Sequence, residues 1–254
     1  MIQDTLKARL NLNAVLRNLE VLPTLDEKAA EIIRDWSVSI RFRIRGDIAP
    51  RLAFSNGKCT YAPDAVDPAD ILLFLWSPAH LNAMFDNKAN PIPLKGFSKL
   101  GFLKNAFPKI TERLEYFLKP DEAALRDPDY VRVNIALSLY TGVFAVCELA
   151  QFDPIASQVI QQMPPGTLQL SVLPDGPEAH IVYDGQGHAT AFRGAAKNPT
   201  ASIAFRDRTI ASRLFNGQLD GFGAVALGDI KLKGLIPLID NTNLILDRIP
   251  LYLQ

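Results

Sequence analysis

The three histidines are the first candidates for acid–base chemistry or metal binding in this 254-residue sequence. His80 lies among apolar residues on a predicted helix, where a lone histidine is commonly structural. His180 and His188 flank a predicted hairpin turn, and a separation of eight residues does not put two metal ligands on one helix or strand face. The histidines therefore predict neither a catalytic base nor a metal site.

Carboxylates and glycine motifs add no further chemistry. Asp64, Asp67 and Asp70 have the spacing of a turn cluster rather than of a calcium loop. The sequence has no GxSxG and no P-loop, and "GQG" at 185–187 precedes a predicted strand rather than a helix. We therefore expect no enzymatic activity, no catalytic residue, no metal and no cofactor.

Composition and cysteine usage narrow the class of protein. Lys+Arg and Asp+Glu are equal at 27 each, and the zero net charge argues against a nucleic-acid binder. Cys59 and Cys147 lack CxxC spacing and a neighbouring histidine, so they do not indicate zinc. Two cysteines suit a reducing compartment, and the N-terminal segment lacks the features of a signal peptide. We expect a cytoplasmic protein.

The segments that would position a site occur twice and in the same order, which predicts two copies of one domain. We expect these copies to span 1–122 and 123–254, with a boundary in the Pro- and Asp-rich stretch 117–130. The first-copy segments and their second-copy echoes are 24–36 and 151–163, 51–61 and 179–191, 68–91 and 199–221, and 95–107 and 228–239.

Each copy has the pattern of an α+β domain with helices over one face of a sheet. Two helices are predicted first, over 5–19 and 25–35 in copy one and over 131–150 and 153–163 in copy two. Three strands with an Asn-Gly or Asp-Gly hairpin turn follow, then a strand, a helix, a fifth strand and a C-terminal helix. The apolar run 133–150 carries polar interruptions and predicts a buried helix rather than a membrane span.

The strand "SIRFRIRG" (39–46) alternates strictly, so its two faces differ. Arg41, Arg43 and Arg45 share the face opposite the apolar one. The matching strand "TLQLSVL" (167–173) keeps the apolar positions but has no arginine, so the fold does not require these side chains. Two interpretations stay open: a solvated face that discourages edge-to-edge pairing, or a surface for an anionic partner.

The stretch "SPAHLNAMFDNKANPIPLKGFSKLGF" (77–102) resembles the sterol carrier protein family, the lipid-transfer domains of type two. Asn90-Pro91 and Gly101 match the family's pattern, whereas Asn87 replaces its usual glycine. Copy two keeps "LFNG" and "GDIKLKG" but has Leu-Asp-Gly at 219–221, where the family tends to carry Asn-Pro.

This resemblance implies two tandem domains, each a five-stranded, mainly antiparallel sheet covered by helices. It also implies an apolar tunnel between sheet and helices that holds a fatty acyl, sterol-like or isoprenoid ligand without covalent chemistry. Some members of the family carry or present lipid intermediates, and others use the domain only for packing.

Apolar residues in the second half of each copy are the candidate lipid-binding residues, although spacing alone does not separate a tunnel wall from ordinary core. They are Leu73, Leu75, Leu81, Met84, Phe85, Ile92, Phe97, Leu100, Phe102, Leu103, Phe205, Ile210, Leu214, Phe215, Phe222, Ile230, Leu232 and Leu235.

The function predicted from these observations is non-catalytic binding and intracellular carriage or presentation of a hydrophobic lipid. The alternative is a scaffold for a lipid-modifying pathway, with a protein partner and no ligand of its own. Peripheral membrane contact is a further expectation, and nucleic acid is not expected as a partner. The apolar segment 243–254 is a lid, a membrane-touching end or a packing element between domains.

Overall fold

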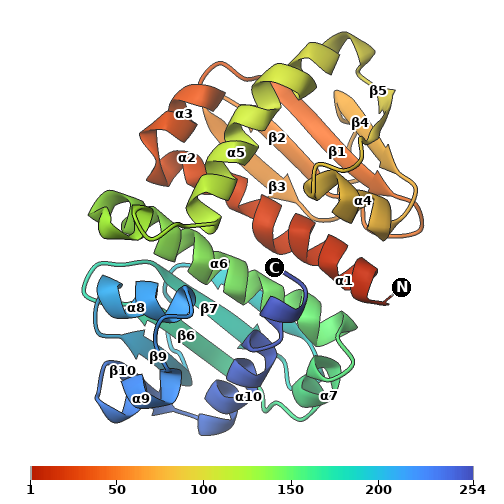
Figure 1. The fold of residues 1–254 in the computed structure, drawn as a ribbon. Coiled ribbons are helices and arrows are strands. Elements are labelled where there is room, and N and C mark those ends of the chain that lie inside the picture. Colours follow the sequence, from red (N-terminus) through yellow and green to blue (C-terminus); the bar gives the residue numbers. More distant parts are fainter. Residues whose placement is uncertain (1, 254) are drawn as a thin grey trace. The chain divides into compact units, whose positions relative to one another are not determined.

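The structure, a computed structural model, describes residues 2–253. The chain divides between Tyr116 and Phe117 into two compact units (Figure 1). This division lies six residues before the boundary predicted at 122–123.

The first unit begins with a helical segment and then builds a sheet. Its helix α1 continues through a π-helical stretch, Leu10–Val15, and a 3₁₀ turn, Leu16–Glu20; it begins at Ile2, earlier than the predicted residue 5. The other helices and the strands are α2 (Leu22–Leu25), α3 (Glu27–Ile33), β1 (Val38–Ile44), β2 (Arg51–Ser55), β3 (Lys58–Ala62), β4 (Ile71–Leu75), α4 (Pro78–Phe85), β5 (Ile92–Lys95) and α5 (Phe107–Leu118).

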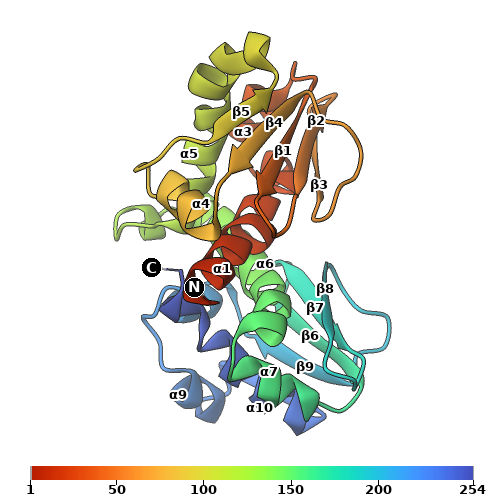
Figure 2. The ribbon, with the colours of Figure 1, turned by 90° about the vertical axis from the view of Figure 1, so that its right-hand side faces the viewer.

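The first sheet has the strand order β3-β2-β1-β4-β5. Three of its pairings are antiparallel, and β1 pairs with β4 in parallel, with Ile40 opposite Ile71. The sheet is therefore mixed but mainly antiparallel. Figure 2 shows α4 and α5 on one side of this sheet. The apolar positions of β1 are buried, as its alternation predicts.

The second unit repeats this plan. Its helices and strands are α6 (Pro128–Phe152), α7 (Ala156–Gln161), β6 (Gly166–Val172), β7 (Glu178–Tyr183), β8 (Ala189–Arg193), β9 (Ala201–Phe205), α8 (Arg208–Phe215), α9 (Gly221–Ala226), β10 (Ile230–Gly234) and α10 (Ile236–Leu246). The strand order β10-β9-β6-β7-β8 is that of the first sheet, and β6 and β9 form the matching parallel pair.

Two glycines mark the same turn in both units, where the fifth strand ends. Gly96 and Gly234 have φ values of 86° and 91°, a left-handed conformation that disfavours other residues. A Cβ at these positions would lie 2.7 Å from the Asp70 carbonyl oxygen and 2.1 Å from the Thr200 carbonyl oxygen. The close approach of this turn to the fourth strand therefore requires glycine in each unit.

The two units differ in the segment after the fourth strand and the helix that follows it. The second has the short helix α9 where the first has Asn90-Pro91. Asp220 caps α9 by accepting the backbone N–H of Gly223 at 2.7 Å. This helix was not predicted, although it begins where copy two departs from the Asn-Pro pattern. The predicted C-terminal helix over 235–253 was too long, because α10 ends at Leu246 and a 3₁₀ turn, Ile249–Leu251, follows.

One helix in the described part of the chain, α6, is long and apolar enough to cross a membrane by length and composition. Its most apolar window is 72% buried, and it packs on β7, β8, α7, α8 and α10 of its own unit. Helix α6 is therefore largely buried within its own unit, as the polar interruptions in 133–150 predict.

Candidate functional site

A cavity of about 230 Å³ opens on the helix-covered side of the first sheet. We call it the Trp36 cavity. Its apolar wall comes from Val38 at the start of β1, from Trp36 just before it, and from Phe102. Its polar rim comes from Asp35, Ser37 and Lys99. Of the eighteen candidate lipid-binding residues, only Phe102 lines this cavity.

An aromatic cluster forms the wall behind the Trp36 cavity. The Trp36 ring packs edge-on against Phe54 and Phe102, with centroid separations of 5.0 and 4.7 Å. Phe107 at the start of α5 lies 6.4 Å from Phe54 and 6.3 Å from Phe102. Such contacts stabilise aromatic pairs beyond area burial alone. The cluster joins the sheet to the chain entering α5, and Phe102, which begins the π-helical turn Phe102–Ala106, is the cluster residue of this segment that lines the cavity.

Lys99, on the rim of the cavity, belongs to a small polar group with Lys95 and Asp70. Lys99 Nζ lies 3.8 Å from Asp70 Oδ1, and Lys95 Nζ donates to the Ala69 carbonyl at 2.6 Å. Asp70 accepts both the hydroxyl and the backbone N–H of Ser39 at 2.8 Å. These two hydrogen bonds, the hydroxyl first, lower the pKa of Asp70, so it is an ionised tie between β1 and β4.

The C-terminal helix of the first unit is held to the rest of the unit by an aspartate–arginine pair. Asp26 caps α3 by accepting the Ala29 N–H at 2.9 Å. Arg113 of α5 donates from Nε and Nη2 to its two oxygens, both at 2.7 Å. Burial alone would raise the pKa of Asp26, but Arg113 and the Ala29 N–H lower it overall.

The second unit has the equivalent pair, with its aspartate fully buried. Asp153 accepts the Ile155 and Ala156 N–H groups at 2.9 and 2.8 Å. Arg248 Nε and the Tyr252 hydroxyl each donate to it at 2.6 Å. Burial opposes ionisation, but Arg248, Tyr252 and the two amides lower the pKa of Asp153 from 3.8 to about 2.

We call these pairs the Asp–Arg clasps. One ties the start of α3 to the C-terminal segment of the first unit, and the other ties the start of α7 to that of the second unit. The aspartates occupy matching positions of the repeated blocks 24–36 and 151–163, which was an available signal. The arginines do not align, since Arg113 lies within α5 whereas Arg248 follows α10. The segment 243–253 is thus fastened within its own unit.

The remaining candidate lipid-binding residues fall into three groups by exposure. The buried ones lie on the fourth strands, the helices that follow them and the start of β10: Leu73, Leu75, Leu81, Phe205, Ile210 and Ile230. The half-buried ones are Met84, Phe85, Ile92, Leu100, Leu103, Leu214, Phe215 and Leu232. The exposed ones are Phe97, Phe222 and Leu235. A ligand role for them stays a prediction.

A second cavity, of about 410 Å³, lies on the second unit between the end of α6, α7 and the turn before β8. Its lining is largely polar and includes Gln151, Ser157, Gln161 and His188. None of the candidate lipid-binding residues contributes to it. A polar surface cavity of this kind does not suit an acyl chain.

The histidines make local structural contacts. His80 Nδ1 is 3.2 Å from the backbone nitrogen of Trp76, and its Nε2 is 3.0 Å from the Asn90 carbonyl oxygen. His180 contacts the Gly194 carbonyl oxygen, and His188 contacts Asp184. Within residues 2–253, no group of three or more His, Cys, Asp or Glu side chains is arranged to hold a metal ion.

No protein-family model and no curated protein matches the chain. Solved structures do match, and three of them cover about two fifths of it. The UbiJ-SCP2 ubiquinone synthesis protein is 16% identical over 39% of this chain and 86% of its own, with a TM-score of 0.30. Sterol carrier protein domain 2 of Helicoverpa armigera is 18% identical over 44% and 91%, with a TM-score of 0.33. Sterol carrier protein 2 like 2 of Aedes aegypti is 17% identical over 42% and 94%, with a TM-score of 0.27.

These three solved structures are described as sterol carrier proteins or as a protein with such a domain, the family that the sequence resembles. At these identities the likeness concerns the fold. The chain itself consists of two α+β units, each with a five-stranded mixed sheet and helices.

Proposed function

We propose that this protein binds a hydrophobic lipid without transforming it, and that the first unit holds the ligand in the Trp36 cavity. The proposal rests on one observation: a cavity with an apolar wall of Trp36, Val38 and Phe102 and a polar rim lies where the sheet meets the chain entering α5. Each buried CH₂ of an acyl or isoprenoid chain contributes about 0.8 kcal/mol to binding.

The volume of the cavity determines which part of the protein has to move for a whole ligand to bind. Pockets for whole small molecules measure about 300–1,000 Å³, more than the 230 Å³ found here. The cavity therefore admits the end of a chain, and a longer ligand requires the segment 97–106 to shift. That segment is a 3₁₀ turn followed by a π-helical turn, geometries that are less stable than an α-helix.

Carriage or presentation of a fatty acyl, sterol-like or isoprenoid ligand is the physiological role proposed. It involves no covalent step and keeps the cytoplasmic location that the sequence predicts. The second candidate function is a scaffold with a protein partner and no ligand. The burial of six candidate lipid-binding residues as ordinary core favours that alternative.

The test is lipid uptake by the whole protein after removal of co-purifying lipid. Native mass spectrometry would be run on this protein with equimolar hexadecanoic acid, an isoprenoid alcohol or cholesterol. We expect a one-to-one adduct with at least one of them. A protein that is lipid-free as purified and takes up none of the three would favour the scaffold.

A further inference from the structure

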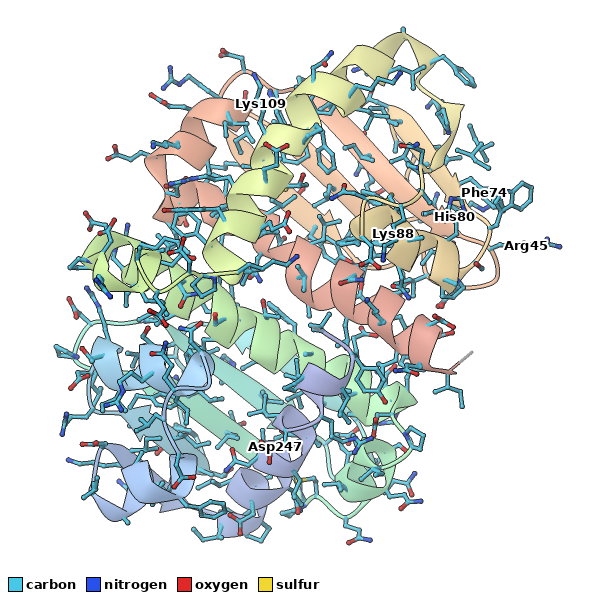
Figure 3. All side chains as sticks on the ribbon, viewed as in Figure 1. Arg45, Phe74, His80, Lys88, Lys109 and Asp247 are labelled. Atoms are coloured by element: carbon cyan, nitrogen blue, oxygen red, sulfur yellow. The ribbon has the colours of Figure 1, made fainter. Side chains whose placement is uncertain are left out.

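The sheet face opposite the Trp36 cavity carries exposed arginines beside aromatic rings. On β1 the apolar positions face the helices, so Arg43 points away from them and is exposed, while Arg41 is half-buried; Arg45, in the turn after β1, is also exposed. In the parallel pairing Arg43 lies directly opposite Phe74 of β4. Figure 3 shows Arg45 and Phe74 at the same edge of the first unit, both pointing outward.

Trp76 completes this surface. Its ring packs edge-on against Phe74 at a centroid separation of 5.0 Å, and the residue is 58% exposed. We call Arg43, Arg45, Phe74 and Trp76 the arginine–aromatic face. A large aromatic side chain exposed to water beside cations is suited to an interface that is apolar on one side and charged on the other.

The arginines of this face are free to meet an external anion. Within the described chain, Arg43 and Arg45 have no ion-pair partner. Two carboxylates near the ends of the neighbouring strands are already engaged, Asp47 with Arg9 and Asp70 with Ser39. Asp64 and Asp67 belong to the loop between β3 and β4.

The second unit provides an internal comparison, because it has the same fold without this surface. The positions equivalent to Arg43 and Phe74 are Ser171 and Ala204. Trp76 corresponds to Arg206, whose charge is paired with Asp207 at 3.0 Å and with Asp229. The arginine–aromatic face is therefore an addition to the first unit rather than a requirement of the sheet.

We propose that the arginine–aromatic face docks the protein on an anionic phospholipid bilayer. Arginines pair with lipid phosphates, and Phe74 and Trp76 enter the interfacial layer. An apolar aromatic pair beside the cations favours a membrane over nucleic acid, as does the zero net charge of the chain. This surface lies across the sheet from the Trp36 cavity, so membrane docking can be tested independently of ligand binding.

The experiment is co-sedimentation of the full chain with vesicles of phosphatidylcholine, with and without phosphatidylserine. We expect binding only to the anionic vesicles, and about a thirty-fold weaker partition for Arg43→Gln/Arg45→Gln, from about fivefold per arginine. Lys231→Gln/Lys233→Gln, on β10 of the second unit, removes the same charge and should bind like wild type. In a Trp36→Phe background, Trp76 fluorescence should shift to the blue on binding.

Three results would overturn the proposal. One is equal binding to neutral and anionic vesicles. Another is an equal loss of binding in the Arg→Gln and Lys→Gln variants, which would indicate unspecific charge attraction. The third is binding to a single-stranded DNA oligonucleotide but not to anionic vesicles, which would make nucleic acid the partner. Circular dichroism of both variants confirms that they are folded.

Discussion

Alanine at Asp26 or at Asp153 is expected to destabilise the unit that contains it by about 3–5 kcal/mol, the largest effect among single substitutions considered. Each change removes the acceptor of an arginine that is mostly buried. Arg113 and Arg248 have side-chain exposures of 22% and 20%. Asp26→Ala also removes the N-cap of α3, and Asp153→Ala removes the acceptor of the Ile155 and Ala156 N–H groups at the start of α7. Urea unfolding followed by circular dichroism measures the loss.

Acid should weaken the second clasp in a defined range. The pKa of Asp153 is lowered in the folded state. Its contribution to the free energy of unfolding is therefore fully present above about pH 4 and is lost as the pH falls toward 2. A fall from 3.8 to about 2 corresponds to about 2 kcal/mol. Between pH 4 and 2, the free energy of unfolding of wild type should fall by about this amount more than that of Asp153→Ala.

Asp220 is the matched control for the clasps. It caps α9 through the Gly223 N–H but is exposed and has no ion pair within residues 2–253. Asp220→Ala should cost about 1 kcal/mol, the usual value for a lost cap. If Asp26→Ala and Asp153→Ala cost no more than Asp220→Ala, the clasps do not hold the C-terminal segments.

Tryptophan at Ser37 should weaken lipid binding by roughly tenfold or more, because an indole in the cavity displaces about two methylenes of the ligand. Ser37 lines the Trp36 cavity and is itself exposed, so the substitution removes no core contact. The free energy of unfolding of the Ser37→Trp variant should differ from that of wild type by less than about 0.5 kcal/mol. Displacement of a fluorescent fatty acid measures the affinity.

Ser55→Trp provides the control for this prediction. Ser55 ends β2 and is exposed, but it does not line the cavity. It adds the same side chain to the same unit and should leave the affinity unchanged. Equal affinities for the two tryptophan variants would exclude the Trp36 cavity as the ligand site.

The fold was largely predictable because its signals are local and repeated. Strict alternation over 39–46 gives a strand with one buried face, and the Asn56-Gly57 dipeptide gives the hairpin between β2 and β3. The preserved order of the blocks predicts two sheets of equal topology. The ends of elements were less predictable: α10 ends at Leu246, and a 3₁₀ turn, Ile249–Leu251, follows it.

The candidate site was less predictable because its parts are far apart in sequence. Phe102 was among the candidate lipid-binding residues, but Trp36 and Val38 were not, since only the folded sheet brings them to the chain entering α5. Apolar character selected Leu75 and Leu81 equally, and both are fully buried core. The arginines of the clasps carry no motif, because an ion pair is defined by geometry rather than by spacing.

The most direct test of the central claim is photolabelling of the lipid-stripped protein with a hexadecanoic acid that carries a diazirine at its methyl end. Peptide mapping would follow. The account predicts saturable labelling of 36–38 and 99–107, competed by unlabelled fatty acid and reduced in Ser37→Trp but not in Ser55→Trp. Labelling confined to the second unit around 186–188, or labelling that does not saturate, would contradict it.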